Sequence, residues 1–432
     1  MNRFATSFVL AVLLLAGQAA SSQPYDRDFY RDHPSKLYGI YEISSFEGTP
    51  DTKAPKGYKP FYISHYARHG ARYQTSEGSY TYLLDIIADA SKSGNLTSLG
   101  ESVYHRLSDY YDLARHRSGD LTPVGFRQHK EWAHRTYRRF PEVFKGNPEI
   151  TACASLVTRC VMSMEAFCLG LKEMDPELDI YAEATRVLLD EVNPGDRENP
   201  NYFDAEPSPY PWDESIEEFT ARLWTDEFAG NIAKRLFSEE YAGSRIDGRT
   251  FINNLYYLVS GMECLDCGIT LDDVLTEDEL FTSWKISNAS FYDWTARSAQ
   301  RYGPILRCII EDADKDIKAG GQAVRLRFGH DGNMLSVLTM IGAKEFAYIP
   351  EKLDSLHLTW QNWNTPMAAT LEFVFYRSMK NPDILFKAVL NGEEIPLSIL
   401  TPVSGPYYRW DDFRDWAENY FERPQGVEKS NE

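Results

Sequence analysis

Three short runs with β-strand character, each followed by charged or polar side chains, limit the folds open to this chain more than any other feature. The runs and the clusters that follow them are residues 61–66 with Arg68-His69-Gly70, residues 149–154 with Ser155 and Arg159, and residues 323–328 with His330-Asp331. Strands that alternate with helices indicate an α/β fold with a mostly parallel sheet flanked by helices. Because ligands bind at the carboxyl ends of parallel strands, we expect the three clusters at one site.

A stretch with helical character separates the second run from the third. Residues 186–215 contain five prolines and are typical of a long irregular connection, whereas apolar residues recur near helical spacing over residues 216–236. We therefore expect residues 23–185 and 298–432 to form the α/β core, with residues 186–297 inserted as a mainly α-helical cap domain.

Two local patterns predict where particular elements start and turn. Thr122-Pro123 predicts a helix start, with Thr122 as the N-cap and Pro123 in the first helical position. Near the end of the chain, residues 386–390, the pair Asn391-Gly392 and residues 393–395 predict a β-hairpin.

Residues 1–22 have the composition of a secretory signal peptide. Arg3 supplies a positive start, residues 8–16 are uninterruptedly apolar, and small residues follow. The apolar run is too short to span a membrane. We expect cleavage near Ala19–Ser22 and a periplasmic or secreted mature protein, which has no later stretch long and apolar enough for a membrane span.

The charge of the chain narrows the class of partner. The 432 residues carry a formal net charge of −19, which disfavours nucleic acid or an anionic membrane as the main partner. A single positive pocket on such a surface can still bind a small anion. The sequence makes no prediction about oligomeric state.

The six cysteines are Cys153, Cys160, Cys168, Cys264, Cys267 and Cys308. In an oxidising compartment they allow up to three disulfides in any of 15 pairings, so no pairing is assigned. Cys264 and Cys267 form an isolated Cys-x-x-Cys pair without the second pair that a zinc site needs. A local disulfide or two ordinary thiols is therefore favoured over a metal or redox role.

The residue types in the three clusters suit a phosphate group. Arg68, Arg72 and Arg159 each offer a planar guanidinium that matches the oxygens of a phosphate, and His69 and His330 can join them. The competing interpretations are a solvated basic turn at residues 68–72, a structural salt bridge at Arg159, and a helix-capping pair at His330-Asp331.

The same residues can carry out phosphoryl transfer. Neighbouring arginines penalise the imidazolium form, so His69 is expected to be neutral and able to attack phosphorus, giving a phosphohistidine. Asp331 is the expected general acid for the leaving alkoxide, since a bound phosphate dianion raises the pKa of a nearby carboxyl. This scheme requires no metal or other cofactor, and the chain has no nucleotide-binding P-loop motif.

At these residues the chain resembles a known family. Arg68-His69-Gly70-Ala71-Arg72 matches the Arg-His-Gly-x-Arg motif of the histidine acid phosphatases, which form branch 2 of the histidine phosphatase superfamily. Residues 329–333, with Asn333 at the end, are similar to the His-Asp motif of that branch, and residues 119–125 resemble its Leu-Thr-Pro-x-Gly helix start. Thr158-Arg159 is similar to the segment that brings a further phosphate-binding arginine.

The resemblance implies a role for each site residue and a two-part fold. It implies His69 as the nucleophile and Asp331 as the proton donor. The phosphate ligands that it implies are Arg68, Arg72, Arg159 and His330. It also implies an α/β core with a helical domain that shapes a pocket for a small-molecule phosphate monoester.

The substrate within the family stays open at this stage. Ala71-Arg72-Tyr73 and the segment from Pro366 look most like multiple inositol polyphosphate phosphatases, whereas His330-Asp331 replaces their common His-Ala-Glu motif. The His-Asp form is shared by phytases and broad acid phosphatases.

Gln74 stands where the family usually has proline, which we interpret as a difference in loop shape. A non-catalytic phosphate-binding protein and a phosphoryl mutase are the alternative functions.

Overall fold

The computed structural model describes residues 25–43 and 49–422. The predicted signal peptide at residues 1–22 therefore lies outside the described residues. Within those residues, no helix combines the length and the apolar character that crossing a bilayer requires.

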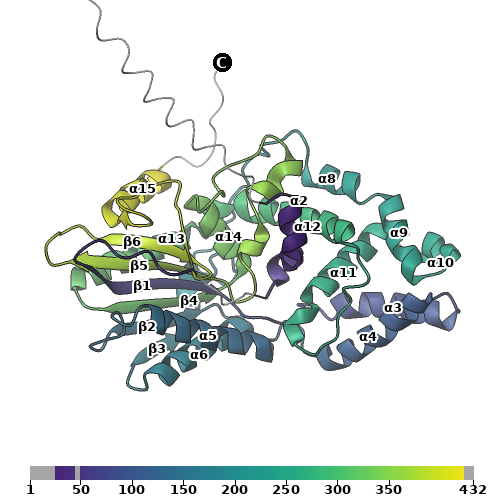
Figure 1. The fold of residues 1–432 in the computed structure, drawn as a ribbon, viewed down its shortest axis with the longest axis horizontal. Helices are drawn as coiled ribbons and strands as arrows, with labels where there is room; N and C mark the ends of the chain where they lie inside the picture. Colours follow the sequence, from purple (N-terminus) through teal and green to yellow (C-terminus); the bar gives the residue numbers. More distant parts are fainter. Residues whose placement is uncertain (1–24, 44–48, 423–432) are drawn as a thin grey trace, which may run out of the picture.

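One sheet of eight strands forms the centre of the fold (Figure 1). Its strands are β1 (Tyr58–Arg68), β2 (Glu149–Ala154), β3 (Ile180–Glu183), β4 (Ala323–Gly329), β5 (Thr370–Ser378), β6 (Leu385–Leu390), β7 (Glu393–Ile395) and β8 (Tyr408–Arg409). The order is β3-β2-β4-β1-β5-β6-β7, with β8 paired to β6. All three runs of the sequence analysis are strands of this sheet.

The α/β class is confirmed, and the sheet is mixed. Strands β3, β2, β4 and β1 run parallel, whereas β5, β6, β7 and β8 are antiparallel to their neighbours. The connections from β5 to β6 and from β6 to β7 are too short for a crossover helix, so these strands can pair only in the antiparallel direction. The parallel strands occupy the half of the sheet where the three clusters occur.

Helices cover both faces of the sheet and extend beyond it. The helices are α2 (Arg27–Asp32), α3 (Gly78–Lys92), α4 (Ser98–Ala114), α5 (Pro123–Arg139), α6 (Thr158–Met174), α7 (Leu189–Val192), α8 (Ile216–Leu223), α9 (Asp226–Leu236), α10 (Glu239–Arg245), α11 (Gly248–Gly261), α12 (Glu277–Phe291), α13 (Gly303–Ala319), α14 (Asp331–Met340) and α15 (Trp410–Glu422). A 3₁₀ helix, η1 (Pro34–Tyr41), precedes the first strand.

Alternating side chains of β1 explain why helices lie on both faces. Ile63 and Ala67 belong to a core with residues of α5 and α6, whereas Tyr62 and Tyr66 belong to a core with residues of α13 and α14. Figure 1 shows α5 and α6 on one side of the sheet and α13 and α14 on the other. Burial on both faces is what a central strand of an α/β sheet requires.

A group of helices lies beyond one end of the sheet (Figure 1). Residues 186–297 supply α7 to α12 and no strand of the sheet. Helices α3 and α4 pack against α11 and α9 in the same group. Residues 78–114, which the predicted domain ranges place in the core, therefore also build this helical layer, and the domain boundaries themselves stay a prediction.

The two local patterns have the expected structures. The Thr122 side chain accepts a hydrogen bond from the Gly125 N–H at the start of α5. Asn391 and Gly392 connect β6 to β7 with φ values of 49° and 84°, which a tight hairpin turn requires. All six cysteines are free thiols in the structure, including the Cys264 and Cys267 pair.

Candidate active site

The parallel register brings the ends of three strands together. Arg68 at the end of β1 is paired with Gly329 of β4, and Ala154 of β2 is paired with Phe328 of β4. The next residues, His69, His330 and Ser155, therefore emerge side by side at one edge. The His69 N–H donates to the Gly329 carbonyl over 3.0 Å, and the centroids of the His69 and His330 rings are 5.7 Å apart.

Two helices begin at this edge and present their N-termini to it. Helix α6 starts at Thr158, which places Arg159 in its first turn, and helix α14 starts at Asp331. Unpaired N–H groups and the helix dipole make such N-termini favourable for an anion. All six residues predicted for the site thus lie around the carboxyl edge of the parallel strands.

Arg68 is held rigidly beneath the site. Its side chain is fully buried, and Nη1 donates to the carbonyl oxygens of Ile40 and Thr365. Nη2 lies 2.9 Å from Oδ2 of Asp331 in an ion pair. Its burial rules out the interpretation of residues 68–72 as a solvated basic turn.

Arg72 and Arg159 keep N–H groups available for a ligand. Arg72 donates from Nη1 to the carbonyl of Tyr73 over 3.0 Å and from Nη2 to the Tyr41 hydroxyl over 3.3 Å, while its Nε has no partner. Arg159 contacts the Gly119 carbonyl at 3.5 Å, and its buried Nε is also unpaired. The neighbouring carboxylate, Asp331, forms its ion pair with Arg68, so within the described residues the salt-bridge interpretation of Arg159 is not supported.

The His69 ring is buried and neutral, and a hydrogen bond to the Gly70 carbonyl fixes its orientation. Burial lowers the pKa of His69 well below its usual value, and Arg68, Arg159, Arg72 and His330 lower it further. Nδ1 lies 2.9 Å from the Gly70 carbonyl oxygen, which can only accept, so Nδ1 carries the ring proton. Nε2 therefore holds the free lone pair of the ring.

His330 is also neutral. Burial and then Arg159 lower its pKa to about 4, although Asp331 acts in the opposite direction. Nε2 of His330 lies 3.1 Å from the Ser155 hydroxyl, and the Cys160 sulfur lies 3.8 Å from the same nitrogen. A neutral imidazole placed in this way can donate one hydrogen bond to a phosphate oxygen.

The surroundings of Asp331 favour its ionised form. Burial alone would raise its pKa, but Arg68, His330 and Arg72 together hold the pKa below its usual value. Oδ1 accepts the Gly332 N–H over 2.7 Å, while His330, the N-cap residue of α14, makes no side-chain capping bond. The raised pKa predicted for Asp331 refers to the site with phosphate bound.

A close backbone contact fixes the loop that carries the first cluster. A Cβ atom at Gly70 would lie 2.5 Å from the Cα of Gly125, so only glycine fits between the end of β1 and the start of α5. The Gly70 N–H donates to the Ser163 hydroxyl over 3.0 Å, and the Ala71 N–H donates to Gln128 over 2.9 Å. These contacts set the direction of His69 and Arg72.

Several residues that support the site carry no sequence signal for that role. Ile40 and Tyr41 come from the 3₁₀ helix η1 and reach Arg68 and Arg72. Gln128 supports the loop from α5. Asn333, part of the predicted motif, donates to the Tyr66 hydroxyl and the Val192 carbonyl, so it anchors α14 instead of reaching the site.

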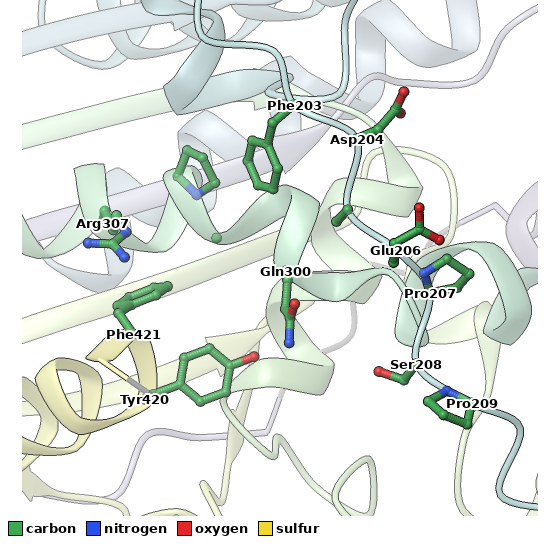
Figure 2. A pocket seen from close by; sticks show the side chains of 13 residues that line it. Phe203, Asp204, Glu206, Pro207, Ser208, Pro209, Gln300, Arg307, Tyr420 and Phe421 are labelled. Carbon is green, nitrogen blue, oxygen red and sulfur yellow. The ribbon is translucent and has the colours of Figure 1, made fainter. Parts of the chain in front are cut away.

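A separate cavity lies between the 203–209 segment, α13 and α15 (Figure 2). None of the six site residues lines it. Figure 2 shows the carboxylates of Asp204 and Glu206 at its edge, with Arg307 beside Phe421. This lining lacks the excess of positive charge that a phosphate ester needs, so the carboxyl edge of the sheet is the candidate active site.

Comparison with known proteins agrees with this geometry. Residues 66–391 match the model of the histidine phosphatase superfamily (branch 2). The match covers well over half of the 432 residues, and the chain therefore belongs to this family. No curated protein matches the chain in sequence.

Solved structures share the fold at low sequence identity. The multiple inositol polyphosphate phosphatase of Bifidobacterium longum, in complex with inositol hexasulfate, has a TM-score of 0.71 and 17% identity over 88% of this chain and 97% of its own. The phytase from D. castellii has a TM-score of 0.69 and 16% identity over 94% and 89%. The phytase from Citrobacter braakii has a TM-score of 0.54 and 13% identity over 84% and 98%.

Proposed function

We propose that this protein is an exported acid phosphomonoesterase that works through a phosphohistidine on His69. The observation that carries the proposal is the state of His69. The ring is buried, its Nδ1–H donates to the Gly70 carbonyl, and burial together with three arginines keeps the ring neutral, so the Nε2 lone pair is free. A site that only binds phosphate needs no such nucleophile.

The proposed reaction has two steps. In the first, Nε2 of His69 attacks phosphorus, the bond between phosphorus and the ester oxygen breaks, and Asp331 gives its proton to the leaving oxygen. In the second, the Asp331 carboxylate takes a proton from water, which attacks phosphorus and breaks the P–N bond. Orthophosphate leaves, and His69 and the protonated Asp331 are restored.

The surrounding residues fit this reaction. Arg68, Arg72 and Arg159 neutralise the phosphoryl oxygens, and His330 donates one further hydrogen bond. The N-termini of α6 and α14 add favourable dipoles from fixed backbone groups. An acidic pH optimum is expected, because Asp331 must be protonated at the moment of ester cleavage while His69 stays neutral.

Phytate and related inositol polyphosphates are the proposed substrate class. Support comes from the family and from a fold shared with phytases and with a phosphatase whose structures contain inositol hexasulfate and phosphate. Export rests on the signal-like composition of residues 1–22.

The test measures phosphate release between about pH 3 and pH 8, a range that includes the expected acidic optimum. Substrates are phytate, a sugar phosphate and an aryl phosphate. His69→Ala is expected to lower kcat more than about a thousandfold on each of them. Asp331→Asn is expected to lower kcat about a hundredfold on the sugar phosphate and far less on the aryl phosphate, whose leaving group needs little protonation.

Three outcomes would contradict the proposal. Full activity of Asp331→Asn on the sugar phosphate would remove Asp331 as the acid. Tight phosphate binding without release from any ester would favour a binding protein. A mutase would transfer the phosphoryl group to a second substrate molecule and release little free phosphate.

A further inference from the structure

Gln74 is buried beside the candidate site and uses all of its polar groups. Its backbone N–H donates to the Tyr80 hydroxyl over 2.7 Å, and its carbonyl accepts from the Gly119 N–H. Its side-chain Nε2 donates to the Tyr257 carbonyl on α11 over 2.8 Å, and its Oε1 accepts from the Tyr41 hydroxyl over 2.8 Å. Histidine acid phosphatases usually have proline at this position. Proline could make neither the backbone N–H hydrogen bond nor the two side-chain hydrogen bonds.

Tyr41 links Gln74 to Arg72. A hydroxyl has one hydrogen to donate, and Tyr41 gives it to Gln74, so a lone pair of its oxygen faces Nη2 of Arg72 at 3.3 Å. The Tyr41 ring also lies beneath the guanidinium, with its centroid 5.1 Å from Cζ. Gln74 therefore determines which way the Tyr41 hydroxyl points.

The helical layer keeps both side chains in place. A Cβ atom at Gly261, the last residue of α11, would lie 2.4 Å from Nε2 of Gln74 and 3.2 Å from the Tyr41 ring. Neither side chain has room to turn toward α11. The connection from α11 through Gln74 and Tyr41 to Arg72 is thus closely packed at each step.

We propose that Gln74 is a positioning residue for phosphate binding, which it supports by orienting Arg72 through the Tyr41 hydroxyl. Two of the five guanidinium N–H groups of Arg72 are used by Tyr73 and Tyr41, which leaves the Nε–H and the remaining Nη hydrogens for phosphate oxygens. The inference rests on the proposed function only in taking phosphate as the ligand.

The test measures the dissociation constant of orthophosphate by calorimetry on the full chain. The variants are Gln74→Met, Tyr41→Phe and the double variant. Each single variant is expected to weaken binding about fivefold, the usual effect of one hydrogen bond. Because Gln74 acts through Tyr41, the double variant is expected to be no weaker than either single variant, whereas independent effects would multiply.

Tyr80→Phe is the matched control. It makes the same chemical change as Tyr41→Phe and also removes a hydrogen bond of Gln74, but this bond goes to the backbone and does not lead to Arg72. Its thermal midpoint is expected to fall while its phosphate affinity stays at the wild-type value. A weakened affinity in this control would indicate a general structural role for Gln74 and overturn the proposal.

Four further outcomes decide the question. If the losses of phosphate affinity in the two single variants multiply in the double variant, the proposal is overturned. Wild-type phosphate affinity in Tyr41→Phe would also overturn it, and this result can be obtained even if Gln74→Met fails to fold. A wild-type protein that does not bind orthophosphate would overturn it as well. If the wild type binds orthophosphate but hydrolyses no ester, the coupled loss of affinity would still support the role of Gln74 while the proposed enzymatic function fails.

Discussion

The ion pair between Arg68 and Asp331 defines the resting state of the site at the level of single residues. Nη2 of Arg68 lies 2.9 Å from the Asp331 carboxylate, and this charge helps to hold the pKa of Asp331 below its usual value. A bound phosphate would attract the same guanidinium and repel the carboxylate. Both effects raise the pKa of Asp331, so the ligand itself would prepare the acid for catalysis.

Phosphate binding is therefore expected to be accompanied by proton uptake at Asp331. At about pH 5 the carboxylate is ionised in the free protein, and a raised pKa in the complex makes it take up part of a proton. Calorimetry of orthophosphate binding in buffers with different ionisation enthalpies measures the number of protons taken up. Asp331→Asn is expected to lower this number, and equal numbers in both proteins would contradict the coupling.

At the scale of elements, the start of α5 holds the loop that carries Arg72. The Thr122 hydroxyl caps α5 by accepting the Gly125 N–H, and it donates to the Ala71 carbonyl over 3.0 Å. Arg72 and Leu121 form an isolated antiparallel bridge next to it. One side chain thus joins a helix terminus to the phosphate-binding loop.

Thr122→Ala is expected to lower the free energy of unfolding by about 1 kcal/mol and also to weaken orthophosphate binding. Thr97→Ala is the matched control, because Thr97 caps α4 in the same way, with the Gly100 N–H at 3.0 Å, but donates to the Arg235 carbonyl of α9 and not to the phosphate-binding loop. Urea denaturation and calorimetry measure the two quantities. Equal phosphate affinity in the two variants would show that the cap does not position the loop.

At the scale of the whole molecule, buried neutral histidines link stability to pH. Burial lowers the pKa of His129 to about 3 and that of His357 to about 4, and His330 also titrates at about 4. In the unfolded chain these residues bind protons below about pH 6.5. Since the unfolded state then binds more protons than the folded state, stability decreases as the pH falls from about 6.5 toward 4.

The free energy of unfolding is therefore expected to fall between pH 7 and pH 5, by up to about 1.4 kcal/mol per pH unit for each such histidine once the pH is well below 6.5. Urea denaturation at several pH values measures the slope. His129 lies in a fully buried position of α5. His129→Leu is expected to reduce the slope of the unfolding free energy against pH by the contribution of one histidine. An unchanged slope would mean that His129 does not titrate on unfolding.

Much of the fold could be predicted from the sequence because the relevant signals are local. Strand alternation, the Thr122 cap and the Asn391-Gly392 turn each depend on neighbouring residues, and all three have the expected structure. Apart from the β6–β7 hairpin, the antiparallel pairing of the sheet could not be predicted, because strand direction depends on which strands pair across the fold.

The candidate site, too, could be predicted from the sequence only in part. The residue types around His69 and His330 determined which ligand and chemistry to expect, since charge and hydrogen-bonding capacity belong to the side chains themselves. Only the tertiary structure showed that Arg68 is held by Thr365, 297 positions away, and that Tyr41 and Gln74 connect Arg72 to α11. Contacts between distant residues leave no periodic pattern in a sequence, because they form only when the packed core brings those segments together.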